Sequence, residues 1–173
     1  MSIVTKFALA TDESIDMLLK LVHELVIEKY SQVLNSQQLQ EYIEKYYSPK
    51  YFVSEMNSMS NQSLMVYADN VAVGYARVTS RGKVPELLND KRVVRIADFS
   101  ILQSFMKPDV QESLWQKCFS VCKYVDAIWI NEYQKNPILE FFESKGFLSK
   151  AGTFELDEIP LPSVCMIYQN SLK

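Results

Sequence analysis

Residues 135–147, KNPILEFFESKGF, contain both ends of one helix and organise the second half of the chain. Asn136 can cap a helix whose first position is Pro137, because proline has no N–H to leave unpaired there and its φ is already helical. Gly146 and Phe147 end it, since glycine adopts the left-handed conformation of a helix stop and an apolar residue commonly follows. The sequence therefore predicts a short helix with two defined boundaries.

Strands are predicted on both sides of this helix. Residues 127–131 form an apolar run just before it, and residues 153–156 and 164–169 follow as two antiparallel strands. Farther upstream, residues 92–102 are rich in Val and Ile, which predicts a long strand. Residues 108–124 are predicted to form a helix between the strands at 92–102 and 127–131, because apolar residues recur at helical spacing after a proline that suits the first turn. The second half thus reads strand, helix, strand, helix, strand, strand.

The first half predicts an opening strand, two helices and a hairpin. The segments are a strand over residues 3–9, a helix ending near Tyr30, a helix from Ser36 that Pro49 should end, a polar loop over 57–62, and strands over 63–68 and 71–79. Asp69 and Asn70 between the last two strands tolerate the dihedrals of a tight turn. The combined order, β-α-α-β-β-β-α-β-α-β-β, predicts an α/β (α+β) fold whose mixed sheet has helices on both faces.

The composition is that of one folded domain without a polyanionic partner or a disulfide framework. The chain has 173 residues, 48% of them hydrophobic, with 18 Lys and Arg against 21 Asp and Glu, so we expect a single domain over residues 1–173 and no nucleic-acid partner. Its 3 cysteines form no CxxC pair, so we expect no metal site and a reducing cytoplasm as the location. Without a signal peptide or an apolar run of about 20 residues, we expect no membrane partner.

Four short motifs accompany this element order. They are Val73-Gly74-Tyr75, Lys135-Asn136-Pro137, the stretch from Phe141-Phe142-Glu143 to Gly146-Phe147, and Gly152-Thr153-Phe154. Over nearly its whole length the chain resembles the Gcn5-related N-acetyltransferase (GNAT) superfamily, and within it the bacterial spermidine/spermine acetyltransferase-like subgroup. The resemblance implies a mostly antiparallel central sheet of about seven strands flanked by about four helices, with acetyl-CoA as cosubstrate and a small primary amine as acceptor. The alternative is that caps and aromatic core positions recur by chance in α/β chains.

The family binds acetyl-CoA at a loop of the form Gln/Arg-x-x-Gly-x-Gly/Ala, whose bare backbone amides face the diphosphate, while the pantetheine arm lies in a V-shaped gap between the fourth and fifth strands. The resemblance places Met106, Lys107, Asp109 and Gln111 on this loop, and none matches the pattern. Asp109 opposes the phosphates, a repulsion of about 1 kcal/mol at about 4 Å in water, which Lys107 partly offsets. The candidate cofactor-binding residues are Ile101, Leu102, Met106, Lys107, Asp109, Val110, Gln111 and Asn136.

The predicted reaction centre also departs from the family pattern. The amine must lose a proton and the departing thiolate must gain one, so the family places a carboxylate on the fourth strand and a tyrosine in the fourth helix. The matching positions are Ala97 and Phe142. Asp98 is the candidate catalytic carboxylate, but adjacent strand residues face opposite sides, so it replaces the missing base only if a β-bulge rotates it inward. Phe142 has no proton to give, although holding amine and thioester in line supplies much of the rate by itself.

An acidic, aromatic patch on the second predicted helix is a candidate acceptor site. Its members are Glu41, Tyr42, Glu44, Tyr46 and Tyr47, in the region where the resembled subgroup receives its amine. Carboxylates and tyrosines suit a cation, whereas the alternative is a solvated helix face with a few buried rings. His23, the one histidine of the sequence, has no neighbours that predict a metal site or a catalytic triad.

Two functions from different classes remain. The first is a divergent GNAT N-acetyltransferase that moves an acetyl group from acetyl-CoA to a small primary amine, with a polyamine as one candidate. The second is a catalytically silent protein of the same fold with a binding or regulatory role. The resemblance favours the first and the lost glycines favour the second, since fold does not guarantee activity. A homodimer is compatible with either.

Overall fold

The computed structural model describes residues 1–156 and 159–170. The strands are β1 (Ile3–Phe7), β2 (Asn61–Ala68), β3 (Val71–Thr79), β4 (Val93–Ile101), β5 (Ala127–Tyr133), β6 (Leu148–Ser149), β7 (Phe154–Glu155) and β8 (Pro162–Gln169). The helices are α1 (Asp12–Tyr30), α2 (Ser36–Tyr46), α3 (Pro49–Met56), α4 (Pro108–Cys122) and α5 (Ile138–Ser144), with short 3₁₀ turns at Glu86–Leu88 and Gln103–Phe105.

These strands form one 8-stranded sheet in the order β1-β2-β3-β4-β5-β8-β6, with β7 paired to β8. Every pairing is antiparallel except that of β4 with β5, which is parallel. The predicted fold class, a mixed and mostly antiparallel sheet flanked by helices, is confirmed. The structure adds α3 and the very short β6 to the predicted order of elements.

Pro49 begins a helix instead of only marking the end of one. α2 ends at Tyr46, and α3 starts at Pro49 after an extended N-cap at Ser48. Proline is disfavoured inside a helix but suited to the first turn, so the same residue fits the stop of one helix and the start of the next. The expectation of a loop over 57–62 was also wrong at its end, because β2 begins at Asn61.

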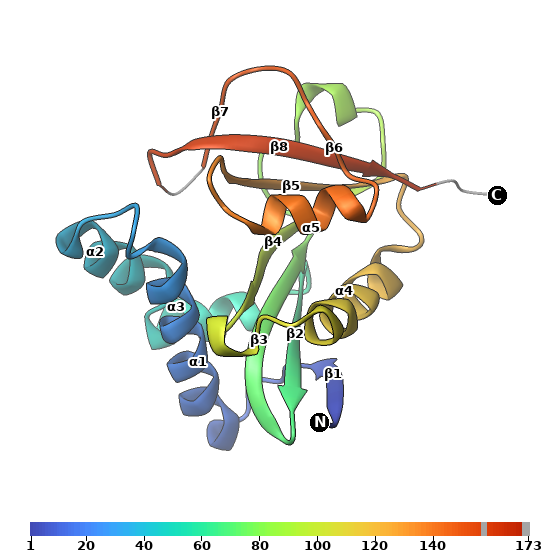
Figure 1. Cartoon of the computed structure of the whole chain (residues 1–173). Helices are drawn as coiled ribbons and strands as arrows, with labels where there is room; N and C mark the ends of the chain where they lie inside the picture. The colour runs from blue at the N-terminus through green and yellow to red at the C-terminus, as the bar shows by residue number, and fades with distance from the viewer. Residues whose placement is uncertain (157–158, 171–173) are drawn as a thin grey trace.

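Helices cover the two faces of the sheet, with α1, α2 and α3 on one side and α4 and α5 on the other (Figure 1). Alternate residues of β2 supply both cores because strand side chains point to opposite faces in turn. Leu64 and Val66 pack in the same core as Leu114 of α4, whereas Met65 packs in the core that contains Leu18 of α1. The strands are therefore buried on both faces where these helices lie.

Local predictions that depend on a few neighbouring residues are confirmed. The side-chain oxygen of Asn136 accepts the N–H of Ile138 at 3.0 Å, as a residue capping the start of α5 should. Gly146 has φ +90°, the left-handed conformation expected at the end of this helix. Asp69 and Asn70 have φ values of 47° and 67°, as the tight turn between β2 and β3 requires.

Within residues 1–156 and 159–170, no helix has the length and apolar character that crossing a bilayer requires. The three cysteines are free and buried. In the same part of the chain, no cluster of His, Cys, Asp and Glu side chains is large enough to hold a metal ion.

Candidate functional site

β4 and β5 begin as a parallel pair and then separate. Their pairing covers only residues 93–95 against 127–129, although β4 continues to Ile101 and β5 to Tyr133. A cavity of about 370 Å³ lies where the two strands have parted, and residues from both of them line it. We call it the β4–β5 cavity. The resemblance predicts a V-shaped gap for a pantetheine arm between these two strands, and ligands commonly bind at the carboxyl ends of parallel strands.

The structure brings together half of the predicted cofactor-binding residues. Ile101, Met106, Gln111 and Asn136 line the β4–β5 cavity. Leu102 and Val110 instead have their side chains in the two hydrophobic cores, and Lys107 and Asp109 are exposed at the start of α4. Their proposed contact with a cofactor stays a prediction.

α1 supplies a wall of this cavity that the sequence did not predict. Leu25, Glu28, Lys29 and Gln32, in or just after α1, all line it. Their spacing of three and four residues places them on one face of a helix. This spacing was a usable signal, but three of the four side chains are polar, and a polar helix face ordinarily indicates solvent.

A nearly buried ion pair lies at this wall. Lys29 Nζ is 2.8 Å from Glu132 Oε1, and both side chains are 11% exposed. The side-chain amide of Asn136 donates to the other oxygen of Glu132. Burial by itself would lower the pKa of Lys29, but the carboxylates of Glu132 and Asp98 raise it above its ordinary value. Lys29 is therefore a fixed positive charge neutralised by a fixed negative one.

Two backbone N–H groups, one just after β4 and one in the first turn of α4, are bound by the chain's own carboxylates. Glu28 Oε2 accepts the N–H of Gln103 at 2.8 Å, where the chain leaves β4. Asp109 Oδ1 accepts the N–H of Val110 at 3.0 Å in the first turn of α4. A negative side chain is favourable at a helix start because the helix dipole is positive there. These carboxylates occupy donors of the kind that bind phosphate groups in other proteins.

Asp98 lies next to a β-bulge, the condition that its proposed role required. Arg77 of β3 pairs with Asp98 while the next residue, Val78, pairs with Ile96, so Ala97 is the extra residue on β4. The carboxylate faces α2 and α3, where Oδ2 accepts from Arg77 Nε at 3.0 Å and Oδ1 accepts from the Tyr47 hydroxyl at 3.2 Å. Both oxygens are thus already engaged within the protein.

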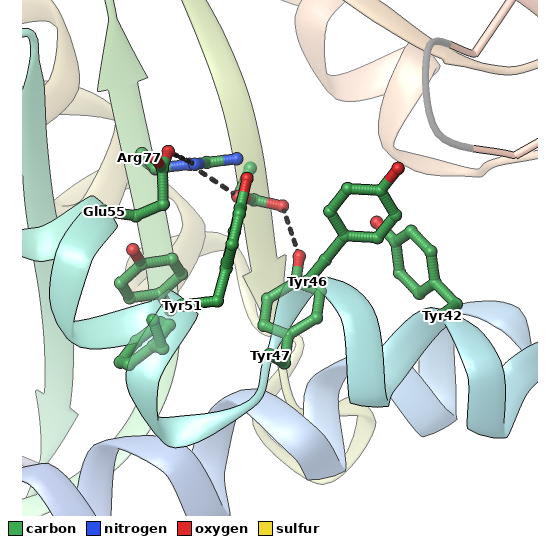
Figure 2. Close-up of a pocket in the computed structure, with 9 residues that line it drawn as sticks. Tyr42, Tyr46, Tyr47, Tyr51, Glu55 and Arg77 are labelled. Carbon is green, nitrogen blue, oxygen red and sulfur yellow. Dashed lines mark hydrogen bonds and ion pairs between the residues drawn. The ribbon is translucent and has the colours of Figure 1, made fainter.

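Aromatic rings surround this carboxylate on the α2 and α3 side. The small pocket there, about 30 Å³, is lined by Tyr42, Tyr46, Tyr47, Tyr51, Phe52, Glu55, Tyr75, Arg77 and Asp98. Figure 2 shows Tyr51 next to Glu55 and Arg77, with Tyr42 and Tyr46 of α2 farther from that pair. Arg77 Nη1 also lies 2.7 Å from Glu55, so the guanidinium bridges two carboxylates and supplies the cation of this pocket.

The predicted acidic patch divides between the inside and the outside of α2. Glu41 and Glu44 are exposed and accept hydrogen bonds from glutamines one turn earlier on the same helix. Tyr42, Tyr46 and Tyr47 line the small pocket instead. His23 Nε2 lies 2.7 Å from the carbonyl oxygen of Tyr47, a contact that ties α1 to the end of α2. The carboxylates and the rings therefore do not form one surface.

Phe142, which the resemblance places at the acid position of the family, is a core residue. It is 1% exposed and packs edge-on against Phe99 and Trp115. Two residues lining the β4–β5 cavity carry hydroxyls, Ser100 and Tyr133, and the Tyr133 hydroxyl donates to the carbonyl of Lys29 at 3.2 Å. Burial first, and then the charge of Glu132, raise the pKa of Tyr133. Sequence reasoning missed this residue because it follows the predicted strand, where no motif marks it.

No protein-family model matches the sequence, and no curated protein matches it. Solved structures of N-acetyltransferases do share its fold. The PaiA N-acetyltransferase of Thermoplasma acidophilum, in complex with coenzyme A, has a TM-score of 0.77 at 12% identity, covering 98% of this chain and 99% of that one. A GCN5-related N-acetyltransferase of Rhodopseudomonas palustris gives 0.70 at 13% identity, covering 98% and 96%. The ribosomal-protein-S18-alanine N-acetyltransferase of Escherichia coli gives 0.65 at 11% identity, covering 99% and 96%. The likeness at these identities shows the fold.

Proposed function

We propose that this chain, whose fold is that of the GNAT N-acetyltransferases, transfers an acetyl group from acetyl-CoA to a small primary amine. The observation that carries the proposal is the β4–β5 cavity, which opens beside the carboxyl end of β4 and the segment leading into α4. A solved structure with this fold contains coenzyme A. A polyamine is the acceptor that the resembled subgroup suggests, and the cytoplasm is the location that the free cysteines suggest.

Acetyl-CoA fits this site by its thioester arm and not by its diphosphate. Six residues of β4 extend past the last pairing with β5, about 20 Å of strand edge along which an extended arm can lie. The segment from β4 to α4 has no glycine, and Glu28 and Asp109 already bind the N–H groups of Gln103 and Val110. We therefore assign binding of the arm to the cavity and no phosphate-binding role to the start of α4.

The side chains present support slow chemistry. Amide formation makes a C–N bond and breaks the C–S bond, while the amine gives up one proton and the thiolate takes one. Asp98 is the candidate for the amine side, although Arg77 and Tyr47 engage both of its oxygens. Phe142 offers no proton, so alignment of the two reactants would have to supply most of the acceleration.

A second candidate is a catalytically silent protein of the same fold with a binding or regulatory role. It is favoured by the two carboxylates that hold the backbone N–H groups near the start of α4. On this alternative the β4–β5 cavity keeps its shape but no longer takes the donor.

Two experiments separate the two candidates. The first is calorimetric titration with acetyl-CoA and with desulfo-CoA, and the second is an assay of thiol release with a panel of primary amines. If the chain is an acetyltransferase, we expect heat on addition of acetyl-CoA and thiol release that depends on the amine. If the chain is catalytically silent, we expect neither binding heat nor thiol release from the natural chain. Acetyl-CoA binding should then be recovered in the Asp109→Gly/Gln111→Gly variant, because the repelling charge and two side chains are removed. If the chain binds acetyl-CoA but none of the amines causes thiol release, the enzymatic proposal is contradicted.

A further inference from the structure

The charges around the β4–β5 cavity are arranged unlike those of a diphosphate site. Glu28 lines the cavity and accepts the backbone N–H of Gln103, which is the second residue after β4 and also lines the cavity. Its carboxylate is therefore fixed where a ligand lying along β4 would leave that strand. Both side chains are exposed, so this charge acts on whatever approaches from solvent.

A second carboxylate lies at the start of α4. Asp109 uses one oxygen to accept the N–H of Val110, which leaves its negative charge at the helix end that would otherwise attract an anion. Lys107 is exposed two residues earlier and offsets one of the two negative charges. Neither Glu28 nor Asp109 forms a salt bridge with a described cation, whereas Lys29 in the cavity wall is already neutralised by Glu132.

The remaining polar lining consists of four carboxamides and the hydroxyls of Ser100 and Tyr133. Gln32, Gln103, Gln111 and Asn136 line the cavity together with the apolar side chains of Leu25, Phe99, Ile101 and Ile138. Carboxamides both donate and accept hydrogen bonds, so they suit a ligand that carries amides and no charge. A pantetheine arm has two amide groups, no charge and apolar segments between them. The lining thus matches the arm, while the surrounding carboxylates oppose the phosphates.

We infer that this site recognises the pantetheine arm of its acyl donor and discriminates against the nucleotide diphosphate, so that an uncharged pantetheine thioester binds more tightly than acetyl-CoA. The inference rests on the proposed function, which it deepens by naming the part of the donor that is bound. Glu28 and Asp109 are the residues that produce the discrimination. In a site that binds phosphate, the nucleotide part of the donor raises the affinity, whereas here it lowers the affinity.

The test is calorimetric titration of the whole chain with S-acetylpantetheine, S-acetylphosphopantetheine and acetyl-CoA at low and high salt. We expect affinity to fall in that order, with about a tenfold difference between the first and the last, since a unit-charge pair at contact distance in water is worth about fivefold. Raising the salt concentration should strengthen acetyl-CoA binding, because salt screens the repulsion. S-Acetylpantetheine should be unaffected by salt.

Two charge-removing variants keep the hydrogen bonds of the site. In Glu28→Gln and Asp109→Asn a carbonyl oxygen remains to accept the backbone N–H, so only the charge is lost. Each should bind acetyl-CoA about fivefold more tightly than the natural chain and leave S-acetylpantetheine binding unchanged. Glu24→Gln is the matched control, since Glu24 is exposed one turn earlier on α1 and does not line the cavity.

The outcomes separate this inference from the proposed function. Acetyl-CoA binding tighter than S-acetylpantetheine binding, or weakened by salt, overturns the inference and supports the proposed function. Equal affinities that neither variant changes also overturn it. Failure of all three donors to bind overturns both.

Discussion

The Lys29–Glu132 pair places two opposite charges beside the β4–β5 cavity, where each depends on the other. Two nearly buried charges lose much of their hydration, and their mutual attraction at 2.8 Å, with the amide of Asn136 on the second oxygen, offsets that loss. The pair also joins α1 to β5, which are far apart in the sequence. It is therefore both part of the cavity wall and a link between elements.

Removing one partner should destabilise the protein more than removing both charges. Lys29→Met leaves the Glu132 carboxylate without its cation, so we expect the free energy of unfolding to fall by about 3 kcal/mol in urea denaturation. The double variant Lys29→Met/Glu132→Gln, which removes both charges, should recover most of that loss. Equal losses in the single and double variants would show that packing, and not charge, is what Lys29 contributes.

The pKa of Lys29 gives the pair a pH dependence at the alkaline end. Burial lowers this pKa, but Glu132 and Asp98 together raise it above the ordinary 10.5. A group whose pKa is raised by folding contributes stability below its unfolded-state pKa and loses it as the pH rises through the folded value. Above pH 10.5 the natural chain should therefore lose stability faster than Lys29→Met, as measured by urea midpoints across that range. Parallel curves would be the contrary result.

At the scale of elements, β4 carries most of what distinguishes the site. Its first residues pair with β5, its bulge at Ala97 turns Asp98 toward α2 and α3, and its last residues line the cavity. On its other edge β4 is held closely by β3. Gly74 of β3 pairs with Ile101, and a Cβ on Gly74 would lie 2.8 Å from the Ser100 carbonyl oxygen and from an Ile101 side-chain carbon.

Gly74→Ala should therefore move β4 away from β3. The close approach involves backbone, which cannot rotate aside, so we expect a loss of about 2 kcal/mol in the free energy of unfolding and weaker thioester binding, because Ile101 lines the cavity. Val71→Ala, at an exposed position on the same strand, is the control and should cost less than about 0.5 kcal/mol. A stable Gly74→Ala variant with unchanged binding would contradict this account of the β3–β4 contact.

The whole molecule determines how accessible the cysteines are. Cys118 and Cys122 pack in the core between α4 and the sheet, and Cys165 packs in a third cluster with Trp129. Burial raises the pKa of all three thiols, to about 12 for Cys122. Neither the thiolate form nor access to reagent is therefore available in the folded state.

A thiol reagent should modify these cysteines only through unfolding. We expect no modification within minutes in buffer and complete modification of all three cysteines in urea. Intact-mass measurement over time gives the number of modified thiols. A saturating pantetheine thioester should slow the reaction further, because a ligand that binds only the folded chain reduces the population of the unfolded one. Fast modification of one cysteine in buffer would reveal a local opening that the packing does not predict.

The sequence alone determined the features that rest on near neighbours and on periodicity. The cap and stop of α5, the turn at Asp69-Asn70 and the order of strands and helices all follow from a few adjacent residues or from one repeating apolar pattern. The candidate cofactor-binding residues came instead from the resemblance, and Ile101, Met106, Gln111 and Asn136 among them line the β4–β5 cavity. The resemblance also predicted the gap between two parallel strands.

Tertiary structure alone decided which polar side chains face that gap. Glu28 and Lys29 lie on a helix face that looks solvent-exposed in sequence, and they reach the cavity because α1 contacts Gln103 and Glu132 there. Tyr133 reaches it as the last residue of β5, which no motif marks. Whether Asp98 faces α2 depended on one extra residue in a strand pairing, and the bond of Glu28 depended on the Gln103 N–H lying within its reach. Such contacts join residues far apart in the chain, and local patterns carry no record of them because folding chooses the partners by geometry.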